Sequence, residues 1–326
     1  MEINAQPCHR EPPHRGVAIQ DNPEIATDAR DVLAMTICDG HAYQRIKACN
    51  VSISRETTNG AKNSGGSVMQ HRYAGDVGDF GKFFLLRRLA HALNLRLGVI
   101  WYLFPDESHN NDGRHINYFD KTRFHNIDNE LLKILRDVSS LNEKRSVRML
   151  ESVNVAPAGS VFFSDYTFAP DNQNLKLSPL QERGRLRKDW VKSALSTVST
   201  CPMVFLDPDN GIEPVSGVSR NSKLAGKYAL MDEITAFAAH HRVTVIYHHL
   251  GRQGKHVEQQ RFHGERLANI GIRDKTVMSV RFSAYSPRAY FIIAEDKVSK
   301  TIWGELEKLT SSERLKNLWD GALAIR

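Results

Sequence analysis

The sequence has little of what marks a secreted, zinc-ribbon or membrane protein. Only four of its 326 residues are cysteines, and none of them forms a C-x-x-C pair. This usage excludes a disulfide framework and favours a reducing compartment. No apolar run is long enough to span a bilayer, and the N-terminus lacks the basic-then-apolar pattern of a signal peptide. We therefore expect a cytoplasmic protein without a membrane partner.

What is present suits a globular protein. Hydrophobic residues make up 41% of the chain and aromatic residues 8%, which is enough for a substantial core. The formal net charge is +7 and the pI is about 9.2, a mild bias toward polyanionic partners such as nucleic acid. Residues 1–68 carry a balance of −1 and the remaining residues +8. Any attraction to phosphate therefore belongs to the second segment.

The chain divides near Met69. Residues 1–68 begin with Pro7, Pro12 and Pro13 and end in a polar tract over residues 57–66. We predict that this part is a poorly ordered N-terminal extension, and that residues 69–326 form the folded domain. Translation that starts at Met69 is an open alternative, and the sequence leaves the oligomeric state open.

After Met69 the signals for strands and helices alternate. Apolar spacing predicts helices over residues 83–93, 131–150, 177–198, 232–240 and 257–269, with a last helix from Ser299 closing the chain. Apolar runs predict strands over residues 97–104, 160–168, 202–206, 243–247, 276–282 and 289–294. Repeated β-α-β order predicts an α/β fold, doubly wound around a mainly parallel sheet, with a C-terminal antiparallel hairpin.

The most informative stretch is the strand over residues 202–206 and the polar residues that follow it. Asp207, Pro208, Asp209 and Asn210 come directly after the apolar run. Ligands of open α/β sheets bind in the crevice outside the carboxyl ends of the strands. We therefore predict that these four residues are catalytic.

A second candidate lies just before the first predicted helix. Gly75, Asp76, Asp79 and Lys82 belong to a glycine-rich stretch that can place backbone N–H groups and a lysine near an anion. The alternative is a tight entry turn in which Asp79 caps the helix. The sequence alone favours neither explanation.

The pattern Ala74-Gly75-Asp76-x-x-Asp79-x-x-Lys82, followed by a helix and a strand, resembles the N-terminal motif of the large-subunit ribosomal RNA adenine-N6 methyltransferases. That family has Asn at the position of Asp76. The resemblance implies a Rossmann-like fold, S-adenosylmethionine as cofactor, and a catalytic strand end at Asp207 and Pro208. Gly75, Asp76, Asp79, Lys82, Asp106 and Asp112 are then the expected cofactor residues.

The chain departs from the family in two places. The loop expected to approach the cofactor is Phe-Pro-Asp-Glu-Ser-His-Asn-Asn-Asp-Gly, without the small residues that permit close backbone approach. The family's Asp-Pro-Pro-Tyr is replaced by residues 207–210, so Asp209 and Asn210 provide no ring to stack on an extruded base.

Two other functions compete with methyl transfer. Asp207 and Asp209 suit Mg²⁺, which would make the protein a metal-dependent nuclease or phosphodiesterase. A nucleic-acid-binding protein without catalysis is the third possibility. Arg252 and Lys255 in a glycine-bearing loop, and Arg185 and Lys188 on the basic helix, are the candidate nucleic-acid contacts. Six histidines lie within residues 240–263, but we predict no metal site there.

Overall fold

The structure is a computed structural model that describes residues 70–325, apart from residues 105–114, 142–144, 170–175 and 253. All described residues belong to one compact unit, Gly60–Arg326. The predicted extension over residues 1–68 and the candidate residues Asp106 and Asp112 lie outside the described residues. The prediction of an α/β fold is confirmed, with a mixed sheet whose central strands are parallel.

Seven strands form the main sheet in the order β2-β1-β3-β6-β8-β7-β9. Strands β2, β1, β3 and β6 are parallel, whereas β8, β7 and β9 each run antiparallel to the preceding strand in this order. The bounds, in that order, are Val161–Phe163, Leu97–Trp101, Met203–Asp207, Val243–His249, Arg288–Glu295, Lys275–Phe282 and Trp319–Ile325. Two short strands, β4 (Gly211–Ile212) and β5 (Tyr228–Ala229), form a separate pair.

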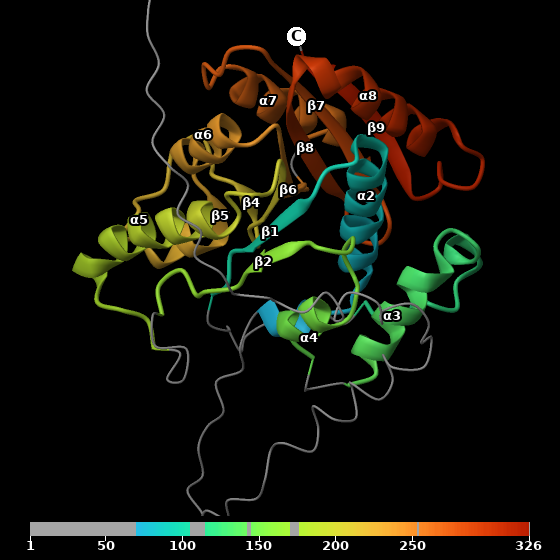
Figure 1. Ribbon diagram of the computed structural model, residues 1–326, viewed down its shortest axis with the longest axis horizontal. Helices are drawn as coiled ribbons and strands as arrows, with labels where there is room; N and C mark the ends of the chain where they lie inside the picture. The colour runs from blue at the N-terminus through green and yellow to red at the C-terminus, as the bar shows by residue number, and fades with distance from the viewer. Residues whose placement is uncertain (1–69, 105–114, 142–144, 170–175, 253, 326) are drawn as a thin grey trace, which may run out of the picture. The chain divides into compact units, whose positions relative to one another are not determined.

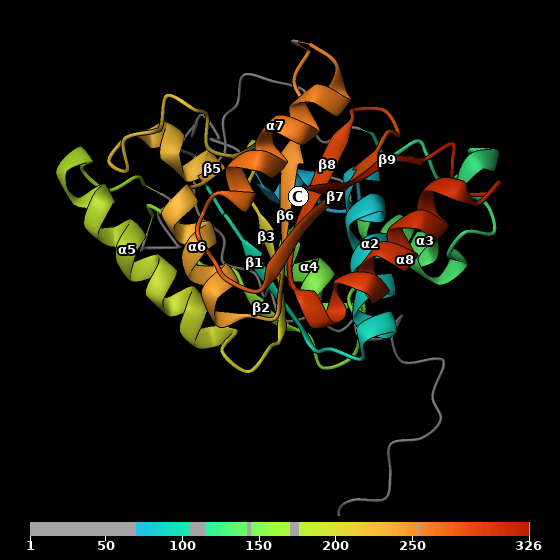
Figure 2. The same cartoon turned by 90° about the horizontal axis from the view of Figure 1, so that it is seen from above.

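Helices cover both faces of the sheet (Figures 1 and 2). One core cluster joins the sheet to α2 (Val77–Leu93), α3 (Asn129–Ser139), α4 (Val147–Ser152) and α8 (Asp296–Ser311). A second cluster joins the other face to α5 (Leu180–Thr197), α6 (Met231–His240) and α7 (His256–Ala268). Below, these faces are called the α2 face and the α5 face.

Side-chain alternation along the strands assigns residues to the two faces. In β3, Met203 and Phe205 pack in the cluster of the α2 face, whereas Val204 and Leu206 pack in that of the α5 face. Successive strand residues point to opposite faces, so Asp207 points to the α2 face. The strand is buried along its whole length, which explains its continuous apolar run.

Three short 3₁₀ helices complete the described elements: Gln70–Tyr73, Thr122–Phe124 and Lys223–Lys227. Several predicted elements differ from those observed. The helix predicted over residues 131–150 is two helices, because Ser140 ends α3 and the Ser146 side chain caps α4. The strand predicted over residues 160–168 is regular only over β2, with an isolated bridge between Leu103 and Tyr166.

The prediction that a helix closes the chain is wrong. Helix α8 ends at Ser311, and β9 follows as the edge strand beside β7. Strand β9 is only partly buried along most of its length, so its sequence lacks the continuous apolar run of the interior strands.

The strand order creates a switch point between β1 and β3. Strand β2 lies on one side of β1 and β3 on the other, so the chain leaves β1 in one direction and returns past it in the other. In open α/β sheets ligands bind outside the carboxyl ends of the strands at such a point. Trp101 and Asp207, the last residues of the two strands, are partners in the register.

Candidate functional site

Asp207 is the point at which the elements of the site meet. It ends the interior strand β3, between β1 and β6. Its side chain lies under the first turns of α2, where Lys82 Nζ donates a hydrogen bond to Asp207 Oδ2 over 2.7 Å. The second carboxylate oxygen, Oδ1, takes no hydrogen bond from the residues that the structure describes. Asp207 is 9% exposed.

The glycine-rich stretch is mostly helix rather than loop. Asp76 is the N-cap of α2, and its carboxylate accepts hydrogen bonds from the N–H groups of Gly78 and Asp79. Asp79 therefore lies in the first turn and is not the cap. The N-terminal N–H groups of the helix need such an acceptor. The helix begins six residues before its predicted start, because the glycine-rich stretch with Gly78 and Gly81, which was predicted to precede the helix, is its first part.

These glycines allow α2 to lie close to the sheet. A Cβ at Gly81 would lie 2.7 Å from the Phe282 ring, and one at Gly78 would lie 3.1 Å from the Arg288 guanidinium. Gly75 has a φ of +83° and faces the backbone of α3. The glycines thus serve packing, because a larger residue would meet Phe282, Arg288 or the backbone of α3.

Lys82 links two carboxylates, one on its own helix and one at the end of β3. Its ammonium bonds Asp79 Oδ1 over 2.9 Å as well as Asp207, and it lies 4.9 Å from the centre of the Trp101 ring. Asp79 Oδ2 accepts the N–H of Gly75 over 2.8 Å. Burial lowers the pKa of Lys82, but the two carboxylates outweigh burial and the pKa is raised. Lys82 therefore stays charged.

Burial and charge act in opposite directions on Asp207. Burial raises its pKa to about 6, against the lowering effect of Lys82. Burial likewise raises the pKa of Asp76, which Arg288 opposes from 4.0 Å. Asp207 is consequently ionised at neutral pH but takes up a proton in mildly acidic solution.

Strands β6 and β8 add residues that the sequence did not single out. Tyr247 of β6 and Arg288 at the start of β8 interact with each other through their side chains, and both belong to the electrostatic surroundings of this cluster. Burial raises the pKa of Tyr247 to about 12. Tyr290, the register partner of Tyr247, has a buried hydroxyl without a hydrogen-bond partner among the described residues. These residues lie near strand ends level with Asp207. This position is the feature of the sequence by which they could have been predicted to belong to the site.

The residues after Asp207 turn away from it. Pro208 is buried, and Asp209 lies 3.8 Å from the ammonium of Lys227. The N–H of Asn210 donates to the Lys227 carbonyl over 2.9 Å. The four predicted catalytic residues, 207–210, therefore follow one another at the end of β3, but Asp207 and Asp209 face different ammonium groups.

Gly211 is needed where the chain passes β6. Its φ is +104°, and a Cβ there would lie 2.4 Å from Nδ1 of His248. That nitrogen accepts the N–H of Ile212 over 3.1 Å. Of the two histidines that end β6, His248 packs at 4.1 Å from the His263 ring in the core of the α5 face. The exposed His249 alternates with it and therefore lies on the face to which Asp207 points.

The histidine cluster does not converge further. Burial lowers the pKa of His248 well below its usual range and that of His263 to about 4, so both are neutral at physiological pH. Within the described part of the chain, no group of three or more His, Cys, Asp or Glu side chains is arranged to hold a metal ion.

The candidate nucleic-acid residues are exposed. Arg185 and Lys188 lie in the first half of α5, and Arg252 and Lys255 lie between β6 and α7. Both segments follow the carboxyl ends of parallel strands, the same edge of the sheet as Asp207. Arg185 pairs with Asp189 over 3.2 Å and Lys255 with Glu258 over 3.6 Å, so these two cations are partly neutralised.

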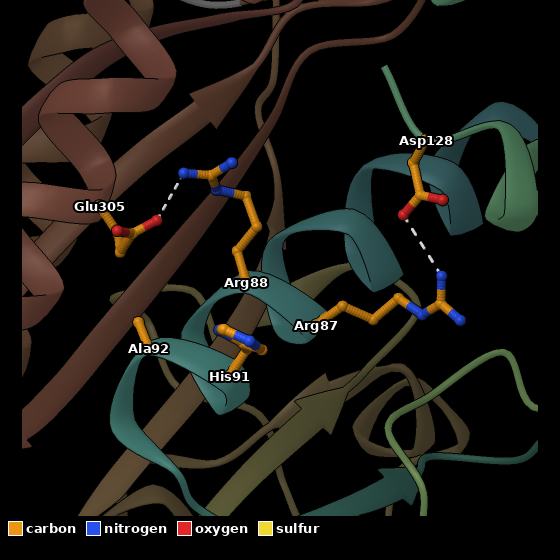
Figure 3. A pocket seen from close by; sticks show the side chains of 6 residues that line it. All are labelled: Arg87, Arg88, His91, Ala92, Asp128 and Glu305. Atoms are coloured by element: carbon orange, nitrogen blue, oxygen red, sulfur yellow. Dashed lines mark hydrogen bonds and ion pairs between the residues drawn. The ribbon is translucent and has the colours of Figure 1, made fainter. Parts of the chain in front are cut away.

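A surface hollow of about 490 Å³ lies at the other end of α2 (Figure 3). Arg87 and Arg88 of its last turns reach across it to Asp128 and Glu305, respectively. Its charges are paired within the hollow, and Lys82 and Asp207 do not line it. The hollow therefore adds nothing to the site.

Comparison with protein-family models and with curated proteins finds no match to this chain. None of the described helices is long and apolar enough to cross a membrane.

Proposed function

We propose that the protein is an S-adenosylmethionine-dependent methyltransferase that acts on an amino group of adenine in nucleic acid. The domain would then be a Rossmann-like, doubly wound fold, closed by the hairpin of β7 and β8. The observation that carries this proposal is the 2.7 Å contact between Lys82 and Asp207. The two residues lie 125 positions apart, and they belong to separate motifs that resemble those of the methyltransferase family.

The position of the contact supports the same proposal. Asp207 lies at the switch point between β1 and β3, where sheets of this kind bind their ligands. When bound, S-adenosylmethionine supplies an electrophilic methyl group on a sulfonium. Asp106 and Asp112 remain predicted cofactor residues.

Asp207 would orient the acceptor. Lys82 holds Oδ2, which leaves Oδ1 to accept a hydrogen bond from the amino group, and the Pro208 carbonyl would accept one from its second N–H. The fixed ammonium keeps the carboxylate in one orientation, and such preorganisation is a large part of catalysis in many enzymes. Since the pKa of Asp207 is about 6, the acceptor form prevails above that pH.

The metal-dependent nuclease has less support. It needs Asp207 and Asp209 as ligands of one ion, yet Lys82 already bonds Asp207 and Lys227 lies 3.8 Å from Asp209. An ammonium thus lies beside each carboxylate where a metal ion would bind. No observation specifically favours either this alternative or a protein that binds nucleic acid without catalysis.

Calorimetric titration of the full chain with S-adenosylmethionine, followed by transfer of radiolabelled methyl groups to RNA and DNA, tests the proposal. We expect binding by the wild type and loss of transfer in Asp207→Asn, with the exposed Asp120→Asn as control. Absence of both binding and transfer would refute it. Thermal stabilisation by Mg²⁺ or Mn²⁺ alone would favour the nuclease.

A further inference from the structure

Tyr285 has a backbone conformation that is costly for its residue type. It lies between β7 and β8 with a φ of +63°, in the left-handed region. The other described non-glycine residues with positive φ are Asn94, Asn126 and Asp274, the types that adopt this conformation most readily. Strained residues of this kind concentrate at functional sites, so Tyr285 calls for an explanation.

Burial of the ring does not explain the strain. Tyr285 is 39% exposed, so its side chain contributes little to the core. The turn is instead fixed by its neighbours, because Arg288 Nη1 donates to the carbonyls of Ala284 and Ser286 over 3.4 and 2.8 Å. These carbonyls belong to the two residues on either side of Tyr285. The turn therefore presents the ring at the surface.

Two exposed side chains contact the ring. The His115 ring centre is 5.0 Å away with an interplanar angle of 40°, and the guanidinium of Arg123 lies over the Tyr285 ring, 5.1 Å from its centre. No carboxylate of the described residues pairs with Arg123, and the nearby Asp120 is bonded to Arg136. We call Tyr285, His115 and Arg123 the aromatic platform. It combines exposed ring surface with positive charge.

The platform is attached to the candidate site on both sides. The His115 carbonyl accepts the N–H of Val77, the first residue of α2, over 3.1 Å. Arg288, which fixes the turn of Tyr285, also approaches the Asp76 carboxylate to 4.0 Å. The turn between β7 and β8 lies at the same edge of the sheet as the end of β3. A ligand on the platform is therefore next to the elements that carry Asp207.

We propose that the aromatic platform binds an unpaired base of a single-stranded nucleic acid by stacking. Exposed rings interleaved with cations are how proteins bind single strands without reading their sequence. The ligand class rests on the proposed function, which needs a base outside a duplex because a stacked and paired amino group is inaccessible. Binding itself requires neither S-adenosylmethionine nor methyl transfer.

Replacement of Tyr285 with glycine separates binding from folding. Glycine adopts positive φ without strain, so Tyr285→Gly should keep or raise the melting temperature. The affinity for a single-stranded oligonucleotide that contains 2-aminopurine should fall on the order of tenfold or more, the usual effect of losing one stacked base. Tyr285→Phe should bind within about twofold of the wild type, because it keeps the ring face.

The matched control is Phe262→Ala, which removes a ring that is 46% exposed on α7, on the α5 face. Quenching of 2-aminopurine by the wild type and Tyr285→Phe, but not by Tyr285→Gly, would support stacking. Unchanged affinity in Tyr285→Gly, an equal loss in Phe262→Ala, or an equal loss for duplex DNA would overturn the platform. If the wild type binds no nucleic acid, both proposals fail. If it binds through Tyr285 but does not bind S-adenosylmethionine, only the proposed function fails.

Discussion

Replacing Asp207 with asparagine should abolish activity. The variant should nevertheless gain stability relative to the wild type as the pH rises. Burial raises the pKa of Asp207 from 3.8 to about 6. Between these values the native protein holds a proton that the unfolded chain has already released. Stability therefore decreases as the pH rises through this window, because the unfolded chain binds fewer protons than the native protein.

The size of the effect follows from the same pKa. One pKa unit corresponds to about 1.36 kcal/mol, so a rise from 3.8 to about 6 lowers the free energy of unfolding by about 3 kcal/mol between pH 4 and pH 7. Asparagine has nearly the same shape and does not titrate. The free energy of unfolding of Asp207→Asn, measured relative to that of the wild type, should therefore increase by about 3 kcal/mol from pH 4 to pH 7.

Urea denaturation of both proteins at several pH values between about 4 and 8, followed by circular dichroism, measures this difference. Asp120→Asn is the control, because its side chain is 87% exposed, and it should follow the wild type at every pH. A difference between Asp207→Asn and wild type that is constant with pH would contradict the raised pKa. If the wild type instead gains stability relative to the variant as the pH rises, the ion pair with Lys82 outweighs burial in its effect on the pKa of Asp207.

Three further outcomes are expected. Lys82→Met leaves the carboxylate of Asp207 buried without its cation and should cost about 3–5 kcal/mol in urea denaturation; a loss below about 1 kcal/mol would mean that the contact is not maintained in solution. Methyl transfer at saturating substrate should increase with pH through about 6, as Asp207 ionises, and a flat profile would argue against this role. Gly211→Ala places a Cβ 2.4 Å from His248 and should lower the melting temperature by several degrees, whereas Gly304→Ala in open space on α8 should raise it slightly.

The resemblance to the methyltransferase family and the positions of its motifs come from the sequence. The sequence placed Asp207 at the end of a buried strand and Lys82 beside the first helix, but it left open whether the glycine-rich stretch is an anion-binding loop or a turn in which Asp79 caps the helix. The tertiary structure made the stretch helical, because Gly78 and Gly81 lie against Arg288 and Phe282. Local propensity disfavours glycine inside a helix, so only the close approach of the sheet explains this start.

The chain by itself determined the α/β class, the order of most elements and the acid that ends β3, because buried strands and amphipathic helices leave distinct apolar patterns. Only the tertiary structure decided which side chains meet. Lys82 lies beside Asp207 and Arg288 beside Asp76 because α2 covers one face of a sheet whose strands come from distant parts of the chain. Such contacts depend on strand order and on which helices cover each face of the sheet, and neither is encoded in local spacing.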